Sequence, residues 1–252
     1  MKKVLILLIM VIAISCKNES KKDRVAEIKT ENFPTDLGLV FKTHGGIDTW
    51  RDAQIVSFNI GEQVHTVDLY SRKTVVHTPK YALGFDGKEV WLEEEKKGNY
   101  KGNPEFYYNL YFYFYAMPFV LADAGIIYEK ADDLIFEETT YPGYKISYEA
   151  DIGASPDDTY MVYYNSKTYQ MEWLAYTVTF TAKESNDDYR LIKYNKWEDV
   201  DGFLLPKEIT WYKMDEKGMP TKAAGNSVEF TLPLVSKGQL AASFFEKPVA
   251  VQ

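Results

Sequence analysis

The chain has 252 residues, of which 46% are hydrophobic and 15% aromatic, and it carries a formal net charge of −8 at pH 7. This acidity argues against nucleic acid as a partner, because such binding needs a basic face that displaces counterions from phosphates. The length and the abundance of Tyr, Phe and Trp favour a single β-rich domain, since aromatic residues suit pleated, half-buried surfaces.

The first fifteen residues have the pattern of an export signal. Lys2 and Lys3 precede an unbroken apolar run over residues 4–14, and Ser15 follows it. A basic start, an apolar core and a small residue before the cut define a secretory signal. The run is too short for a membrane-spanning helix, which needs roughly 20 residues. We therefore predict a signal peptide over residues 1–15 and an exported protein.

Cys16 is predicted to carry a lipid anchor. Ala13-Ile14-Ser15-Cys16 resembles the bacterial lipobox, although alanine replaces the usual leucine three positions before the cysteine. Cys16 is the single cysteine of the chain, and a lone cysteine in an exported protein needs an explanation. Lipid attachment supplies one, with a membrane as the partner and the outer membrane as the expected location. The alternative is that cleavage falls elsewhere and Cys16 is lost with the signal.

A polar segment follows the cysteine. Residues 17–36 are rich in Lys, Glu, Asp, Asn, Ser and Thr and hold few apolar side chains. Such a composition cannot bury enough apolar surface to offset the entropy of ordering the backbone. The segment 16–35 is therefore predicted to be a flexible tether, and the folded domain is expected over residues 36–252.

The domain is expected to begin with a short helix and two hairpins. Residues 36–45 place Leu37, Val40 and Phe41 on one helical stripe, and His44-Gly45-Gly46 provides a stop. The residues from 54 to 70 alternate with a period of two around a turn at 61–62, which predicts a hairpin. A second hairpin is predicted over 81–93, because Asp86-Gly87 tolerates the positive φ values of a type I′ turn.

The segment 104–124 differs from its surroundings. Pro104 can occupy the first turn of a helix, and apolar residues then follow helical spacing on nearly all faces. A helix that is apolar nearly all round is buried on more than one side. The run of aromatic residues 111–115 could also form a strand, and periodicity alone does not decide between the two. A helix broken near Pro118 is the interpretation we adopt.

Strands are expected to resume after Gly125 as an antiparallel meander. Turn-forming residues separate the segments, among them Pro142-Gly143 and Asp201-Gly202. The expected strands cover about 134–139, 143–151, 158–165, 169–182, 189–198, 204–216 and 226–235. The fold is therefore predicted to be mainly β (α+β), an open antiparallel half-barrel of about eleven strands with one or two helices against its concave face.

Four turn and strand-end motifs mark the domain: His44-Gly45-Gly46 before Trp50, Phe85-Asp86-Gly87-Lys88-Glu89-Val90-Trp91, Tyr163-Tyr164-Asn165-Ser166-Lys167-Thr168 before Trp173-Leu174, and Trp197-Glu198-Asp199-Val200-Asp201-Gly202-Phe203-Leu204-Leu205-Pro206. These motifs resemble a family of Bacteroidetes lipoproteins that is similar to the lipoprotein carriers LolA and LolB. The resemblance covers roughly residues 36–235. It implies a half-barrel of about eleven strands whose apolar cavity, covered by helices, receives acyl chains. The carriers also have an arginine that locks the helices; Arg51 and Arg72 are candidates here, but no motif assigns the role.

No catalytic or metal-binding pattern is present in the sequence. His44 at a helix end is expected to act as a cap. His65 and His77 lie on predicted strands without a further ligand at metal-type spacing, and the acidic pairs fall at turns and strand ends. No nucleophile elbow of the Gly-x-Ser-x-Gly type appears. We therefore expect a protein that is not an enzyme and needs no cofactor.

Aromatic side chains are the remaining candidates for function, because they can line a cavity in a half-barrel. The same residues could instead fill a solid core. Our leading hypothesis is a lipid-anchored protein that binds an acyl chain, lipopeptide or other amphiphile. The alternatives are a sugar- or peptide-binding module with surface aromatics, and a hydrolase whose site is scattered through the sequence. The candidate cavity residues are Trp91, Tyr108, Phe112, Phe114, Met117, Trp173, Tyr176 and Trp211.

Overall fold

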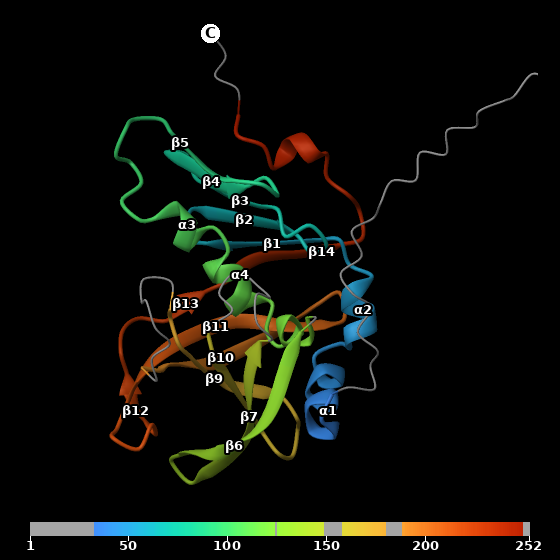
Figure 1. Cartoon of the computed structure of the whole chain (residues 1–252), viewed down its shortest axis with the longest axis vertical. Helices are drawn as coiled ribbons and strands as arrows, with labels where there is room; N and C mark the ends of the chain where they lie inside the picture. Colours follow the sequence, from blue (N-terminus) through green and yellow to red (C-terminus); the bar gives the residue numbers. More distant parts are fainter. Residues whose placement is uncertain (1–32, 124, 149–157, 180–187, 249–252) are drawn as a thin grey trace, which may run out of the picture.

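The computed structural model of the chain describes residues 33–123, 125–148, 158–179 and 188–248 (Figure 1). The predicted signal peptide, Cys16 and nearly all of the tether lie outside the described residues. The helical elements are α1 (Thr35–Thr43), α2 (Ile47–Arg51), α3 (Pro104–Tyr107), α4 (Leu110–Tyr115) and the 3-10 turns η2 (Phe119–Ala122) and η3 (Ala242–Phe244).

Two antiparallel sheets form the body of the molecule. Sheet A has the order β14-β1-β2-β3-β4-β5, with β14 (Thr231–Ser236), β1 (Ile55–Ile60), β2 (Gln63–Asp68), β3 (Thr74–His77), β4 (Tyr81–Phe85) and β5 (Val90–Glu94). Sheet B has the order β12-β11-β10-β9-β8-β7-β6, with β12 (Pro220–Ala223), β11 (Phe203–Met214), β10 (Arg190–Val200), β9 (Met171–Tyr176), β8 (Tyr160–Tyr164), β7 (Thr139–Tyr148) and β6 (Ile126–Phe136).

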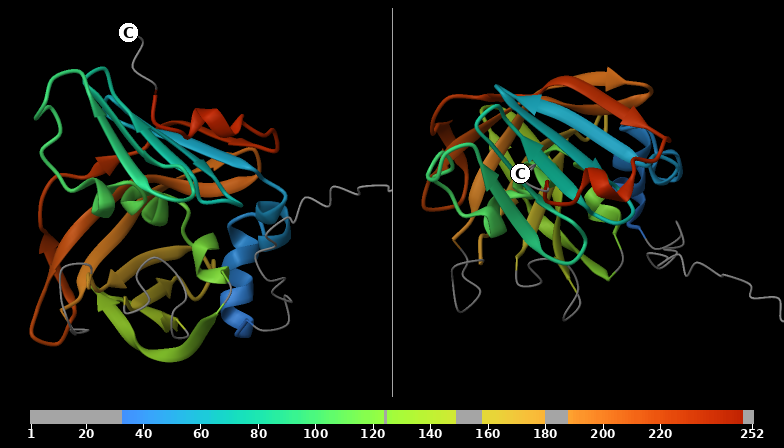
Figure 2. Two further views of the ribbon diagram at one scale, coloured as in Figure 1. Left: turned by 45° about the horizontal axis from the view of Figure 1, so that its top comes forward. Right: turned by 90° about the horizontal axis from the view of Figure 1, so that it is seen from above.

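The two sheets are joined through β13 (Val228–Glu229), which pairs with β11. Phe230 N then donates to Lys207 O at 2.9 Å, and the chain continues directly into β14, which pairs with β1. The strands therefore follow one another from β5 through β1 and β14 to β11 and on to β6. Figure 2 shows the two sheets facing each other across the interior. β5 and β6 are the two ends of this order, and β12, the other end strand of sheet B, lies next to β6, where Ile135 N donates to Met219 Sδ at 3.3 Å.

The prediction of a mainly β, antiparallel half-barrel with few helices is confirmed, although the described residues hold fourteen strands rather than about eleven. The expected strand 226–235 divides into β13 and β14 at Phe230, which adds one strand. The other two are β3 and β12, which have only four residues each and were not expected from the sequence. The helix expected over 36–45 is confirmed as α1. Gly45 ends it with φ 117°, and a side chain there would meet Gly202 O at 2.7 Å.

The turn expected at Pro142-Gly143 is wrong, because both residues lie within β7. The ladder between β6 and β7 shifts register at this point: Ala131 pairs with Gly143, and Leu134 pairs with Tyr141. Pro142 falls opposite this bulge, so its missing N–H costs no ladder hydrogen bond. The hairpin is therefore longer and more strongly bent than the sequence indicated.

Buried side chains form three clusters. The central cluster lies between the two sheets and includes residues of α1, α2, α4 and η2, such as Leu37, Trp50 and Leu121. A second cluster surrounds Trp173 on the other face of sheet B, where the β6–β7 hairpin packs. A third cluster on the outer face of sheet A holds Trp91 and is covered by Phe245 of the C-terminal segment. The concave space of the half-barrel is thus filled by helices.

Candidate functional site: the lid segment and the interior it fills

The segment that connects β5 with β6 is the central feature of the candidate site. Residues 104–122, which we call the lid segment, leave β5 at one edge and lead to β6 at the other. Pro104 starts α3, and the Asn103 side chain caps it by accepting from Glu105 N at 2.9 Å. The helix predicted here is confirmed, but it is interrupted twice and forms α3, α4 and η2 in succession (Figure 1).

The second half of the lid segment is completely enclosed. Every residue from 114 to 122 is buried, with Tyr115, Ala116 and Leu121 at 0% exposure. Helices that cover a sheet bury one stripe and expose the other to water. A stretch that is buried on all sides instead occupies the inside of the barrel, which explains why its sequence is apolar on every face.

Aromatic rings from both sheets and from α2 hold this stretch in place. Phe119 stacks on Trp50 at 4.4 Å between centroids, and Tyr115 stacks on Phe58 at 4.1 Å. The ring centroid of Phe114 lies 5.1 Å from that of Tyr176 and 5.8 Å from that of Trp211. The indole N–H of Trp211 donates to the hydroxyl of Tyr176 at 2.8 Å, which orients both rings toward Phe114.

Hydrogen bonds from two tyrosines satisfy backbone carbonyls of the lid segment. Tyr194 on β10 donates to Phe114 O at 2.9 Å, and Tyr128 on β6 donates to Leu121 O at 2.6 Å. These carbonyls lie at helix ends, where intrahelical partners are missing. Without the tyrosines, buried acceptors would be left unpaired at a cost of about 1–3 kcal/mol each.

Two arginines meet the C-terminal end of the lid segment. Arg72, in the turn between β2 and β3, donates from Nη2 to both carboxylate oxygens of Asp123 at 2.7 Å. Its guanidinium also lies 5.2 Å from the ring centroid of Phe112. Arg51, at the end of α2, donates to Ala122 O at 3.4 Å. We call Arg51, Arg72 and Asp123 the arginine clamp, because together they tie sheet A and α2 to the lid segment.

The structure brings five of the eight candidate cavity residues together. Phe112, Phe114, Met117 and Tyr176 belong to the central cluster, and Trp211 packs against it. Tyr108 is half-buried at the start of the lid segment, and its ring centroid lies 5.4 Å from that of Phe85.

The other two candidates lie in separate clusters. Trp91 lies in the cluster on the outer face of sheet A and donates from Nε1 to Phe245 O at 2.8 Å. Trp173 lies on the other face of sheet B, near Phe136 and Tyr212. Neither indole belongs to the cluster that surrounds the lid segment.

The sequence reasoning missed several residues of the site. Trp50, Phe58 and Tyr194 line the space around the lid segment, but each sits in a pattern that any core strand or helix shows. Asp123 and Arg72 are 51 positions apart, and nothing in their local sequences links them. The sequence suggested Arg51 and Arg72 as candidates for a lock. Their contacts with the end of the lid segment can be seen only in the folded structure.

His44 joins three elements. It caps the end of α1, its Nδ1 donates to Leu204 O at 2.9 Å, and its Nε2 accepts from Met171 N at 3.1 Å. Both ring nitrogens are thereby used by the neutral form. Burial lowers the pKa of His44 to about 4, against the opposing effect of the hydrogen bond to Leu204. The expected role as a cap thus extends to a buried bridge between β9 and β11.

His65 lies under the first half of the lid segment. It stacks on Phe58 at 4.9 Å and donates from Nε2 to Gln63 Oε1 at 3.1 Å. The hydroxyl of Tyr107, in α3, donates to the same oxygen at 2.6 Å. Burial lowers the pKa of His65 to about 3, so the ring is neutral at physiological pH. Gln63 therefore connects sheet A with the lid segment.

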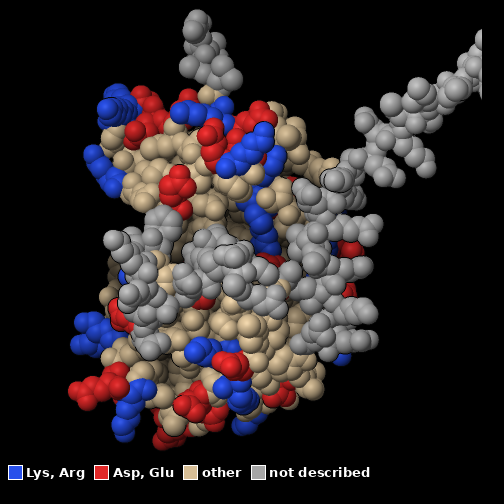
Figure 3. All heavy atoms as spheres, in the orientation of Figure 1, with Lys and Arg blue, Asp and Glu red and all other residues tan. Residues whose placement is uncertain are grey.

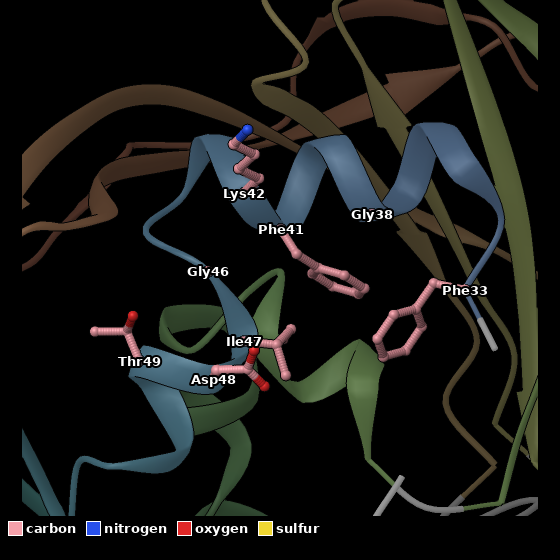
Figure 4. Close-up of a pocket in the computed structure, with 8 residues that line it drawn as sticks. All are labelled: Phe33, Gly38, Phe41, Lys42, Gly46, Ile47, Asp48 and Thr49. Atoms are coloured by element: carbon pink, nitrogen blue, oxygen red, sulfur yellow. The ribbon is translucent and has the colours of Figure 1, made fainter. Parts of the chain in front are cut away.

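A separate open pocket of about 290 Å³ lies between α1 and α2 (Figure 4). Phe33, Phe41 and Ile47 form its apolar part, and Lys42 also lines it. The volume is just below the range for ligand pockets, roughly 300–1,000 Å³. Gly38, Gly46, Asp48 and Thr49 complete the lining.

Figure 3 shows acidic and basic side chains interspersed over the upper and lower parts of one face. Within the described ranges, no group of three His, Cys, Asp or Glu residues is arranged to hold a metal ion. None of the described helices combines the length and apolarity needed to cross a bilayer.

Comparisons with known proteins place the chain in a family. No curated protein matches it. A LolA superfamily protein from Nitrosomonas europaea is 8% identical and has a TM-score of 0.40, with 82% of this chain and 96% of the other covered. A DUF1329 family protein from Desulfovibrio piger is 10% identical with a TM-score of 0.40, with 82% and 95% covered. The likeness expected from the sequence thus recurs as a distant resemblance. The profile of the DUF6503 family, a family of unknown function, matches residues 2–226, and the chain belongs to that family.

Proposed function

We propose that the protein is a non-enzymatic, lipid-anchored component of the outer membrane that binds an acyl chain, lipopeptide or similar amphiphile inside the half-barrel. The observation that carries the proposal is the complete burial of residues 114–122 between the two sheets. This stretch occupies the space that a ligand would take, and it belongs to the connection between β5 and β6 rather than to either sheet.

Apolar side chains of the lid segment and an acyl chain would compete for the same surface. Burial of each methylene group stabilises by about 0.8 kcal/mol, so a long acyl chain can replace the contacts of side chains such as Phe114, Met117 and Phe119. The displaced side chains lose burial as the ligand gains it, so the net free energy of binding is smaller than the ligand's own burial would give. Such partial cancellation suits a protein that must take up a ligand and release it again.

The non-enzymatic part of the proposal draws on the state of the buried histidines. His44 and His65 are held neutral by burial, and His44 uses both ring nitrogens in structural hydrogen bonds. A general base needs a pKa near the working pH and access to a substrate proton. Neither histidine meets these conditions.

A row of half-buried tyrosines supports a second candidate, a sugar- or peptide-binding module. Tyr81, Tyr100, Tyr107 and Tyr111 follow one another with centroid separations of 5.0, 6.0 and 5.7 Å. Aromatic rings with polar tips are frequent at recognition surfaces. Their rings, however, are tilted or perpendicular to one another, and Tyr107 is engaged with Gln63, so we rank this candidate second.

Tryptophan quenching by a brominated fatty acid tests the leading proposal, because bromine quenches indoles that it touches. The sample is the mature chain from residue 16 with Cys16→Ser. Dibromostearic acid should quench the emission, and Trp50→Phe and Trp211→Phe should each remove part of the quenching, since both indoles contact the lid segment. Trp91→Phe and Trp173→Phe are the matched controls. Quenching that is absent, or that depends on the two controls, would refute the proposal.

A further inference from the structure

The pocket between α1 and α2 lies where the described chain begins (Figure 4). Phe33 lines the pocket and is also the first residue that the structure describes. Its ring meets that of Phe41 edge to face, with 4.9 Å between the centroids, and Ile47 adds a further apolar side chain. At about 290 Å³ the pocket is smaller than most ligand sites, and its size suits one or two apolar side chains.

Gly38 keeps one side of this pocket open. It lies in the interior of α1, where glycine is the least favourable residue after proline. Its φ is not positive, so the backbone does not require glycine there. A Cβ atom at this position would have nothing within 4 Å beyond its own helix backbone, so packing among the described residues does not require glycine either. A group that approaches the helix closely at this point would explain why no side chain is present.

Lys42 and Asp48 place opposite charges on the lining of the pocket. Both side chains are exposed, and neither forms an ion pair with another of the described residues. Complementary charges orient a contact even where they add little affinity. The lining therefore matches an occupant that has an apolar centre and carries charges of both signs.

The sequence just before the pocket has this composition. Residues 24–29, which lie outside the described residues, read Arg-Val-Ala-Glu-Ile-Lys and hold the three apolar side chains between Cys16 and Phe33. Ile28 is five positions before Phe33, a reach of up to about 17 Å, which is enough for the chain to turn back onto the pocket. A segment joined to its site by so short a linker has an effective concentration in the mM range, so a weak contact is sufficient.

We propose that the pocket between α1 and α2 is the docking site of residues 24–29, with the side chains of Val25 and Ile28 in its apolar part. The glutamate and the basic residues of the segment then complement the charges on the lining. With the anchor predicted at Cys16, docking leaves residues 17–23 as the free tether and cuts its extended reach from roughly 55 Å to roughly 25 Å. The pocket thereby sets how far the half-barrel lies from the membrane.

A disulfide cross-link tests the docking, because Cys16→Ser leaves the mature chain without cysteine. In a glutathione buffer, the pair Ile28→Cys and Lys42→Cys should show an effective concentration at least tenfold above that of the pair Ile28→Cys and Lys130→Cys. Lys130 is the matched control, because it is exposed on β6, two positions from a tyrosine whose ring centroid lies 5.9 Å from that of Phe33. Equal effective concentrations for the two pairs would overturn the proposal.

A substitution in the segment shows whether the cross-link depends on docking. Val25→Ser should lower the effective concentration of the Lys42 pair several-fold, because it removes an apolar side chain from the pocket. The same substitution should leave the Lys130 pair unchanged. An effective concentration of the Lys42 pair that does not respond to Val25→Ser would also overturn the proposal.

Gly38→Ala gives an independent measurement on the mature chain with Cys16→Ser. In a variant that also carries Val25→Ser and Ile28→Ser, the alanine should raise Tm by about 2–4 °C, because only its higher helix propensity acts. With residues 24–29 unaltered the gain should be clearly smaller, because the added methyl group displaces the docked segment. Equal gains in the two backgrounds would contradict the docking. Neither measurement uses an acyl chain, so both results are independent of the proposed function.

Discussion

Arg72 and Asp123 form a two-pronged ion pair that ties a turn of sheet A to the end of the lid segment. Both oxygens of Asp123 lie 2.7 Å from one nitrogen of Arg72, and the two side chains are 32% and 34% exposed. A partly exposed pair contributes about 1 kcal/mol or less to stability. The pair is therefore strong enough to bias the position of the lid segment and weak enough to open.

Removal of this pair should loosen the lid segment. In Arg72→Ala or Asp123→Asn, the backbone amides of residues 114–122 should exchange with deuterium about fivefold faster, because the free energy of local opening falls by roughly 1 kcal/mol. Hydrogen-exchange mass spectrometry measures the effect. Lys196→Ala, which breaks an exposed pair with Glu208 on sheet B, is the control and should leave this exchange unchanged. Equal protection in Arg72→Ala and in the unaltered chain would contradict the role of the clamp.

Phe119 should be a major contributor to stability. Its ring is 2% exposed and stacks on Trp50, so Phe119→Ala should lower the free energy of unfolding by about 3–5 kcal/mol through lost burial and a cavity. Urea denaturation followed by circular dichroism gives the value. The matched control is Phe244→Ala, since Phe244 is 46% exposed and should contribute less than about 1 kcal/mol. Similar losses for the two variants would show that the lid segment is not part of the cooperative core.

Stability should fall as the pH falls below about 6.5. The unfolded chain protonates His44 and His65 there, whereas the folded chain resists protonation until pH is about 4 for His44 and about 3 for His65. Each histidine then lowers the free energy of unfolding by about 1.4 kcal/mol per pH unit between these limits. Urea titrations at pH 6 and pH 5 measure the slope. His44→Gln should reduce it, whereas the exposed His77→Gln should not; an identical slope in all three proteins would count against the buried neutral state.

Cys16 lies outside the described residues, and its lipid attachment stays a prediction. Cells fed an alkyne analogue of palmitate should incorporate the label into the protein, because diacylglycerol would be added to the cysteine before cleavage. Gel fluorescence after coupling to a dye detects the label, and Cys16→Ser should abolish it. A protein that remains unlabelled, or a label that survives the substitution, would remove the basis for membrane anchoring.

Local patterns in the sequence determined much of the fold. The hairpin of β4 and β5 follows from Asp86-Gly87, and the lid segment follows from helical spacing that is apolar on all faces. Pro142 misled the prediction because a proline indicates a turn locally, whereas its position opposite a bulge depends on the partner strand. Trp91 and Trp173 show the same limit, since alternation does not tell which of two buried faces a side chain occupies. The clamp joins residues far apart in the chain, so no local pattern predicts it.

The lid segment is connected at both ends, through residues 95–103 to β5 and at its other end to β6. A segment that is held at both ends cannot open by rotation about a single hinge. Under the proposed function, entry of a ligand would require this doubly attached segment to bow outward or to move β5 and β6 with it. A longer or branched tail would then load these two connections more than a short one.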